Sequence, residues 1–196
     1  MAENIYLLRH GLTESNKKKI YAGWSEECLC EEGVVALHKI GRKLKEFKIE
    51  KIFSSPIRRA IQTAEIINSF LEKTIEIEEK LKEIKMGLWE GLSEIEVEGK
   101  FENEWEIWIT KPSRLKLDGR ESLRELQLRA LKAIKKITNS SDYSRILVVT
   151  HVAIIRVLII YYNNLSMDIY KKIDVPNGAV YLLDNKAQMQ KIVRVL

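Results

Sequence analysis

Cysteine is scarce in this chain of 196 residues, which contains only Cys28 and Cys30. The two thiols lie one residue apart, and the chain has no other cysteine that could complete a zinc site with them. We therefore expect reduced thiols in a loop. A chain of this length buries enough surface to fold without a disulfide or a structural metal.

Long apolar runs are also missing. The longest run, residues 152–162, contains Arg156 and is too short to span a membrane, so it fits a core helix. The first residues carry no basic stretch ahead of their apolar run, so no secretion signal is indicated. We expect a cytoplasmic protein that does not bind membranes.

Neither sign of charge dominates, because 33 Lys and Arg residues oppose 28 Asp and Glu residues for a formal net charge of +5. The basic residues are scattered, and no basic stripe interleaved with aromatic residues indicates nucleic-acid binding. The small positive excess suits an anionic substrate. Repeats and low-complexity linkers are absent as well, so residues 1–196 are predicted to form a single domain.

Short apolar runs of strand length alternate along the chain with longer amphipathic segments. The runs that resemble strands are residues 5–8, 51–54, 74–77 and 145–150, with 181–184 and 191–196 as two final strands. Helical spacing covers residues 31–47, 57–71, 120–137 and 152–161, and short helices are expected between 93 and 109. The pattern indicates an α/β protein whose last two strands lie near an edge of the sheet.

Two of the three histidines, His10 and His151, follow directly after a buried strand. Ligands of open α/β sheets bind beyond the carboxyl ends of the strands, and His10 is flanked there by Arg9 and Gly11. An isolated Arg-His-Gly turn is compatible with a plain surface turn, but the whole pattern favours an anion site built around a histidine. His38 lies beside the apolar stripe of a helix, where we expect it to pack rather than to bind a ligand.

The helix over residues 57–71 is predicted to begin with Ser55 as its N-cap and Pro56 as its first residue. Its first turn contains Arg58 and Arg59, although this end of a helix is already positive. Two arginines facing solvent are one interpretation. The other is an anion site, because helix N-terminal N–H groups and a guanidinium together bind phosphate.

Four motifs of the chain, in their order, resemble those of the histidine phosphatase superfamily, the clan of cofactor-dependent phosphoglycerate mutases and related phosphatases. They are Arg9-His10-Gly11 with Asn16, residues 54–64, Glu83 ahead of residues 87–91, and the strand that ends in Thr150-His151. The resemblance implies a phosphoglycerate mutase-like fold, a three-layer sandwich with a mostly parallel central sheet flanked by helices. It also implies a helical cover at about residues 93–119.

The same resemblance implies roles for individual residues. His10 is the nucleophile that becomes phosphohistidine, and Glu83 is the general acid. The residues that hold the phosphoryl group are Arg9, Arg59 and His151, and those that bind phosphate or substrate beside them are Asn16, Gly23 and Val152. Arg59 rather than Arg58 matches, because the motif places its arginine directly before Ala60.

Phosphoryl transfer needs positioning and stabilisation of charge on three equatorial oxygens. Two guanidiniums and a protonated imidazole can supply this, so we expect no metal and no cofactor. The attacking nitrogen of His10 must be neutral, so its other ring nitrogen should donate to a backbone carbonyl. Glu83 must alternate between acid and base, so its pKa should be raised.

The chain departs from the family pattern in two places. Val152 follows His151 where the family often has Gly, and where the acid-phosphatase branch has Asp as proton donor. Residues 22–33 retain Gly23 but carry Ala, Glu, Cys and Cys in place of Gln, Asp, Pro and Thr. These changes affect the loop on the substrate side more than the phosphate pocket.

The basic insertion of phosphoglycerate mutases is missing between residues 93 and 118. Residues 87–91 and 119–122, with Trp105 and Trp108, look more like the small phosphatases, including α-ribazole phosphatase and broad-specificity enzymes. We therefore expect a metal-independent hydrolase of small phosphorylated metabolites. A phosphoglycerate mutase is the alternative, followed by a protein-phosphohistidine phosphatase or a regulatory phosphate-binding module. A homodimer is compatible with an edge strand near the C-terminus.

Overall fold

A six-stranded sheet in the order β3-β2-β4-β1-β5-β6 forms the centre of the fold. The computed structural model describes residues 2–139, 142–185 and 190–196. The strands are β1 Asn4–Arg9, β2 Lys51–Ser54, β3 Ile75–Ile77, β4 Arg145–Thr150, β5 Val180–Asp184 and β6 Ile192–Arg194. The first four run parallel to one another, and β5 pairs antiparallel with both β1 and β6 at one edge. All six predicted strands are present, and their ends lie within two residues of the predicted ends.

Side chains of the central strands alternate between two apolar cores, one on each face of the sheet. In β1, Ile5 and Leu7 pack into one core, whereas Tyr6 and Leu8 pack into the other. Strands covered on both faces need apolar residues at successive positions. This is why β1 and β4 read as continuous apolar runs.

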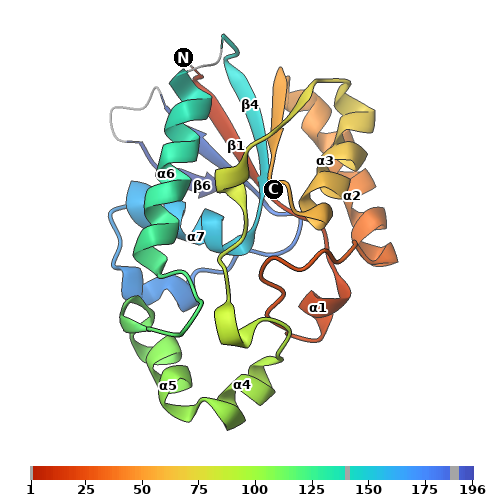
Figure 1. Ribbon diagram of the computed structural model, residues 1–196. Helices are drawn as coiled ribbons and strands as arrows, with labels where there is room; N and C mark the ends of the chain where they lie inside the picture. Colours follow the sequence, from red (N-terminus) through yellow and green to blue (C-terminus); the bar gives the residue numbers. More distant parts are fainter. Residues whose placement is uncertain (1, 140–141, 186–189) are drawn as a thin grey trace.

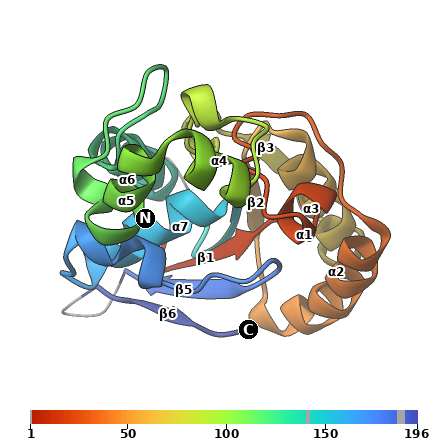
Figure 2. The ribbon, with the colours of Figure 1, turned by 90° about the horizontal axis from the view of Figure 1, so that it is seen from below.

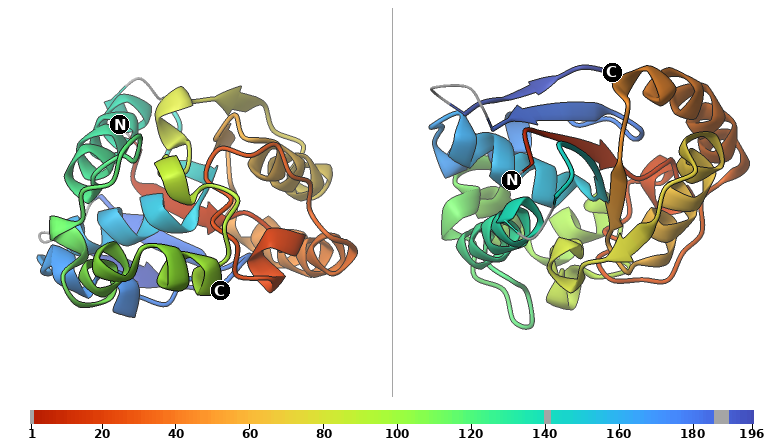
Figure 3. Two further views of the ribbon diagram at one scale, coloured as in Figure 1. Left: turned by 60° about the horizontal axis from the view of Figure 1, so that its bottom comes forward. Right: turned by 90° about the horizontal axis from the view of Figure 1, so that it is seen from above.

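Helices cover both faces of the sheet (Figure 1). α2 Glu31–Leu44 and α3 Arg58–Leu71 lie on one face, and α6 Leu123–Asn139 and α7 Val152–Tyr162 lie on the other. The right view of Figure 3 looks down on the sheet between these two helical layers. The expected three-layer sandwich with a mostly parallel sheet is confirmed.

Several of the shorter elements, among them α4 and α5, lie near the carboxyl ends of the parallel strands (Figure 2). The short α-helices are α1 Glu14–Lys17, α4 Glu94–Lys100 and α5 Glu102–Thr110. The 3₁₀ helices are η1 Lys45–Phe47, η2 Glu79–Leu81, η3 Gly87–Trp89, η4 Pro112–Arg114 and η5 Met167–Lys172. Trp89 and Trp108 are buried and their rings lie 6.1 Å apart at an angle of 73°, so this region packs on an aromatic cluster.

The predicted start of α3 was wrong. The helix begins at Arg58, and its N-cap is Ile57. The Ser55 hydroxyl instead accepts a hydrogen bond from the Ile57 N–H and lies 2.7 Å from Nε2 of His151. Ser55, which the local sequence pattern predicts as the N-cap, therefore contacts His151 instead of capping the helix.

The predicted start of α6 was also wrong, because the helix begins at Leu123 rather than at Arg120. Arg120 forms an isolated β-bridge with Met86, and its guanidinium lies 4.6 Å from the ring centre of Trp108. Ser122 and Glu125 exchange hydrogen bonds between side chain and backbone N–H. This reciprocal pair fixes the start of the helix.

Cys28 is exposed, Cys30 is buried, and both are free thiols, as predicted. Across residues 2–139, 142–185 and 190–196, no helix combines the length and the apolar character needed to cross a bilayer.

Candidate active site

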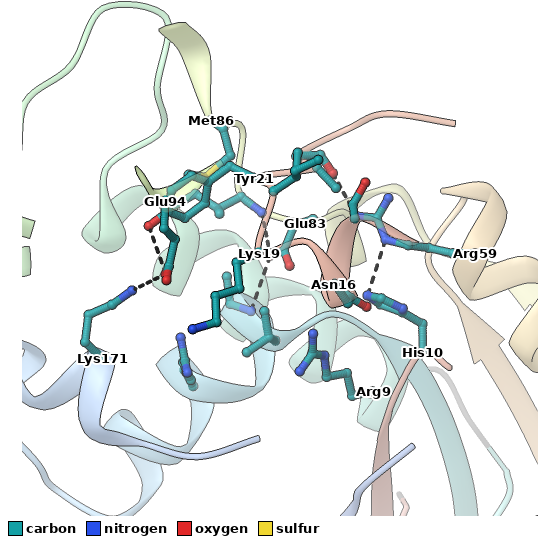
Figure 4. A pocket seen from close by; sticks show the side chains of 18 of the residues that line it. Arg9, His10, Asn16, Lys19, Tyr21, Arg59, Glu83, Met86, Glu94 and Lys171 are labelled. Atoms are coloured by element: carbon teal, nitrogen blue, oxygen red, sulfur yellow. Dashed lines mark hydrogen bonds and ion pairs between the residues drawn. The ribbon is translucent and has the colours of Figure 1, made fainter. Parts of the chain in front are cut away.

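A pocket of about 240 Å³ opens beyond the carboxyl ends of β1 and β4. Strand β1 brings Arg9 and His10 to it, α3 brings Arg59, and the segment after η2 brings Glu83. Figure 4 shows these four side chains converging on one side of the pocket, although they are far apart in the sequence.

Seven of the eight residues that the sequence predicts for the site line this pocket. They are Arg9, His10, Asn16, Gly23, Arg59, Glu83 and Val152. The eighth, His151, is fully buried, and its ring centre lies 5.2 Å from that of His10. The structure therefore brings all eight into one region.

The ring of His10 is held in one tautomer by its two neighbours. Nδ1 lies 2.8 Å from the carbonyl oxygen of Gly11, which can only accept a hydrogen bond, so Nδ1 carries the proton. Nε2 lies 3.3 Å from Nε of Arg59, which can only donate, so Nε2 presents a lone pair. His10 is thus neutral, with a lone pair on Nε2, and the predicted contact of Nδ1 with a backbone carbonyl is confirmed.

Arg59 is buried, whereas its neighbour Arg58 is exposed. The guanidinium of Arg59 donates to the carbonyl oxygen of Gly23 at 2.8 Å and to that of Ser25 at 3.0 Å. Gly23 has a φ of +49°, and a Cβ there would collide with the carboxylate of Glu90. Glycine at this position therefore lets the backbone reach Arg59, and of the two arginines only Arg59 faces the pocket.

Two buried donors beside His10 have no hydrogen-bond partner among the described residues. They are Nε of Arg9 and Nδ1 of His151. The Ser55 hydroxyl accepts from Ile57 and can donate its own proton to Nε2 of His151, an arrangement in which the ring proton lies on Nδ1. Unpaired buried donors at a cationic site fit an oxyanion, since leaving them unsatisfied is costly.

The surroundings of both histidines oppose the protonated imidazole expected from the sequence. Burial and the cations Arg59 and Arg9 hold the pKa of both His10 and His151 well below the usual value. His151 in its neutral form still donates through Nδ1, so it can serve an oxyanion without carrying a charge. Burial lowers the pKa of Arg9 to about 10, which leaves this guanidinium charged near neutral pH.

Glu83 is buried, and burial raises the pKa of its carboxyl group despite the opposing effect of Arg59. The raised pKa was predicted. Its Oε1 accepts hydrogen bonds from the N–H groups of Ile84 at 2.8 Å and Ala153 at 3.3 Å. Both contacts use one carboxyl oxygen, which leaves Oε2 for a group in the pocket.

Asn177 contributes to the site but was not predicted. Its side-chain amide nitrogen donates to Oδ1 of Asn16 at 2.7 Å, and it also contacts the carbonyl oxygens of His10 and Gly11 at 3.2 and 3.1 Å. Asn177 thereby ties Asn16 to the loop that carries His10. The Asn177-Gly178 turn ahead of a strand was the available signal.

Arg129 of α6 was not predicted either. Its guanidinium donates to three carbonyl oxygens, those of Lys80 at 2.8 Å, Lys82 at 2.7 Å and Glu83 at 2.8 Å. Glu121 holds the same guanidinium through two contacts of 2.6 and 2.8 Å. Arg129 therefore fixes the backbone that carries the Glu83 side chain.

Metal ligands do not gather in this pocket within the part of the chain that the structure describes. The set of three His, Cys, Asp or Glu side chains close enough to share an ion is Glu14, Cys30 and Glu32, which do not line the pocket. Lys17 bridges the two carboxylates of that set at 2.9 and 2.7 Å.

Comparison with known proteins relates the chain to one family. The family model of the histidine phosphatase superfamily (branch 1) matches residues 5–196. A relative from Hydrogenobacter thermophilus, named putative phosphoserine phosphatase 2, is 25% identical over 191 residues, which cover 97% of this chain and 94% of that protein. An Escherichia coli relative, named probable phosphoglycerate mutase GpmB, is 31% identical over 151 residues, which cover 75% and 68% of the two chains.

Among solved structures, one of a putative alpha-ribazole-5'-P phosphatase from Escherichia coli matches with a TM-score of 0.87. The match covers 100% of this chain and 96% of the other, at 20% sequence identity. At this identity the likeness supports the fold alone.

Proposed function

This chain belongs to the histidine phosphatase superfamily, and from that premise we propose that it is a metal-independent phosphatase acting on small phosphomonoesters through a phosphohistidine at His10. One observation carries the proposal. A neutral His10, with its Nε2 lone pair available, shares a pocket with Glu83, a buried carboxyl group whose pKa is raised. Binding alone would require no such acid, which disfavours a regulatory module.

In the first step, Nε2 of His10 attacks phosphorus and the ester P–O bond breaks. Glu83 gives its proton to the departing oxygen and becomes a carboxylate. The charge on the equatorial oxygens is stabilised by Arg9, Arg59 and the Nδ1–H of His151. For Arg59 these contacts would replace its present hydrogen bonds within the protein.

In the second step, the Glu83 carboxylate takes a proton from water as that water attacks phosphorus, and the N–P bond breaks. Inorganic phosphate leaves, and Glu83 is again protonated. Val152 and Ala153, at the start of α7, line the same pocket, and the N-terminus of a helix suits an anion. Asn16 is proposed to contact a phosphate oxygen, and Gly23 to position Arg59.

The size of the pocket supports a small substrate over a phosphorylated protein. Its volume is about 240 Å³, and Trp108 of α5 and Glu94 of α4 line its outer part. The proposed cover over residues 93–119 thus contributes walls to the pocket.

Relatives bearing phosphatase and mutase names both match the chain, so hydrolysis and isomerisation must be separated by experiment. We propose hydrolysis, because the segment between residues 93 and 118 lacks a basic insertion to retain a bisphosphorylated intermediate. EDTA-treated enzyme is incubated with 3-phosphoglycerate and a trace of 2,3-bisphosphoglycerate, and with p-nitrophenyl phosphate. Phosphate release should exceed formation of 2-phosphoglycerate at least about tenfold, whereas rapid isomer exchange would identify a mutase. Loss of p-nitrophenyl phosphate hydrolysis in EDTA, restored by magnesium, would refute the metal-independent mechanism.

Arg129 is predicted to act through the position of Glu83. Arg129→Gln should lower kcat/KM for an alkyl phosphate about tenfold, since small displacements of a catalytic group are costly. The loss should be smaller for p-nitrophenyl phosphate, whose leaving group needs little protonation. Arg124→Gln, an exposed change on the same helix, is the matched control and should leave both values unchanged. Equal losses on both esters in Arg129→Gln would mean a general structural role instead.

A further inference from the structure

A second group of charged side chains lines the pocket on the side away from His10 and Arg59. Figure 4 shows Glu94 and Lys171 on the far side of the pocket from His10 and Arg59, with Lys19 between the two groups. Arg156 of α7 also lines it. In a phosphomonoesterase this is where the leaving group of the substrate would lie, so these residues would determine which leaving group is accepted.

Glu94 and Lys171 neutralise each other and are held in place. Nζ of Lys171 lies 3.2 Å from Oε1 of Glu94, and the Tyr21 hydroxyl lies 3.4 Å from the same oxygen. Nε1 of Trp108 donates to the Tyr21 hydroxyl at 3.0 Å. Trp108, Tyr21, Glu94 and Lys171 thus form one hydrogen-bonded wall with no net charge.

Lys19 and Arg156 are not neutralised in this way. Neither has a carboxylate partner within ion-pair distance among the residues that the structure describes. Nε of Arg156 donates to the carbonyl oxygen of Ile173 at 2.8 Å, and its guanidinium lies 5.2 Å from the ring centre of Tyr170, so it is fixed in orientation.

The backbone of Lys19 is also fixed. Its φ of 52° is uncommon for a residue other than glycine. Its carbonyl oxygen accepts from the Glu94 N–H at 3.0 Å, and Ile20 forms a bridge with Ser93. The loop that carries Lys19 is therefore attached to the start of α4, beside the neutral wall.

The balance of charge then points to the substrate. Arg9 and Arg59 balance the two charges of a phosphoryl group, and Glu94 balances Lys171. Lys19 and Arg156 remain, both cationic, and Arg156 lies against Tyr170, whose ring packs on Trp108 of the neutral wall. Resting on the proposed function, we propose that the leaving group carries a carboxylate bound by Lys19 and Arg156, so that the substrate is a short phosphorylated hydroxy acid.

An ammonium group or a neutral sugar would not use these two cations. A positively charged leaving group would be repelled by both, and a neutral one would gain no ionic contact. The pocket volume of about 240 Å³ suits a short acid. A carboxylate is therefore the group that this side of the pocket complements best.

The test compares two substrates that differ in one group, 3-phosphoglycerate and glycerol 3-phosphate, in which a hydroxymethyl replaces the carboxylate. The purified enzyme should show a kcat/KM about tenfold to a hundredfold higher for 3-phosphoglycerate, the range expected for hydrogen bonds to a charged group. Lys19→Met should reduce this ratio about tenfold, and Arg156→Gln should reduce it at least as far. Lys18→Met removes an exposed neighbouring lysine that does not line the pocket, and should leave the ratio unchanged.

The outcomes separate this inference from the function on which it rests. In one outcome the wild-type enzyme hydrolyses p-nitrophenyl phosphate and yet shows a kcat/KM for 3-phosphoglycerate no higher than that for glycerol 3-phosphate. That result would overturn the carboxylate subsite and leave the proposed phosphatase activity intact. If Lys18→Met and Lys19→Met lowered the ratio of the two kcat/KM values equally, the preference would come from general attraction of anions. That result would also overturn the subsite. Failure to hydrolyse any of the three esters would refute the proposed function itself.

Discussion

Replacing His10 with alanine is expected to abolish turnover of alkyl and aryl phosphates alike, with a loss of about ten-thousand-fold or more. In the proposed mechanism the imidazole provides the nitrogen to which the phosphoryl group is transferred, so no change of leaving group can compensate for its removal. The expected nucleophile, Nε2, already presents a lone pair in the structure. The measurement is kcat for p-nitrophenyl phosphate and for 3-phosphoglycerate at saturating substrate.

His38→Ala is the matched control for this change. His38 is exposed on α2, with its ring centre 5.6 Å from that of Phe70, and its removal should leave kcat within about twofold, as for most surface substitutions. Thermal unfolding of both variants checks that they are folded. A folded His10→Ala enzyme that retains more than a small fraction of wild-type turnover would remove His10 from the reaction.

Glu83→Gln is expected to slow phosphorylation of His10 about a hundred-fold to ten-thousand-fold for alkyl esters, the usual effect of losing a positioned acid. The loss should be smaller for p-nitrophenyl phosphate, because its leaving group is already a stable anion. The measurement is kcat/KM, which reports the steps up to departure of the leaving group.

The pH dependence gives a second measure of the same residue. The first step needs protonated Glu83, so its rate should fall as pH rises through the pKa of this group. Since burial raises that pKa, the fall should begin at higher pH than for an exposed glutamate, and it should disappear in Glu83→Gln.

Glu90→Gln is the control for Glu83, because this second carboxylate lies on the same segment and is exposed. It accepts a hydrogen bond from the Trp24 N–H at 3.3 Å and does not line the pocket. A Glu83→Gln enzyme that is equally impaired on alkyl and aryl esters, or unimpaired on both, would contradict the assignment. Glu90 would then be the acid to test.

The sequence was sufficient for the sheet and for the residues that follow its strands. β1 and β4 are continuous apolar runs that pair directly in the sheet, so the residues at their carboxyl ends meet. This brings His10 and His151 together without any information about loops. Arg59 could be assigned through the resemblance, because the family motif places its arginine directly before Ala60. The unusual position of arginines in the first turn of a helix applied to Arg58 and Arg59 alike.

Contacts between distant segments were beyond local sequence patterns. Ser55 has the character of a helix cap, but its hydroxyl is taken by His151. Arg120 continues a helical pattern, but it stacks on Trp108 and pairs with Met86. Arg129 binds backbone carbonyl oxygens. Every residue type has this group, so the sequence cannot indicate which residues bind Arg129.

Whether His10 carries the phosphoryl group can be measured by trapping the intermediate in Glu83→Gln with p-nitrophenyl phosphate. The aryl leaving group departs with little help from an acid, whereas attack by water lacks its base, so the phosphoenzyme should accumulate. After a quench in alkali, peptide mass spectrometry should find one phosphoryl group on His10, stable in base, lost in acid, and absent from His10→Ala. Turnover without any phosphoenzyme, or a phosphoryl group on another residue, would contradict the proposed mechanism.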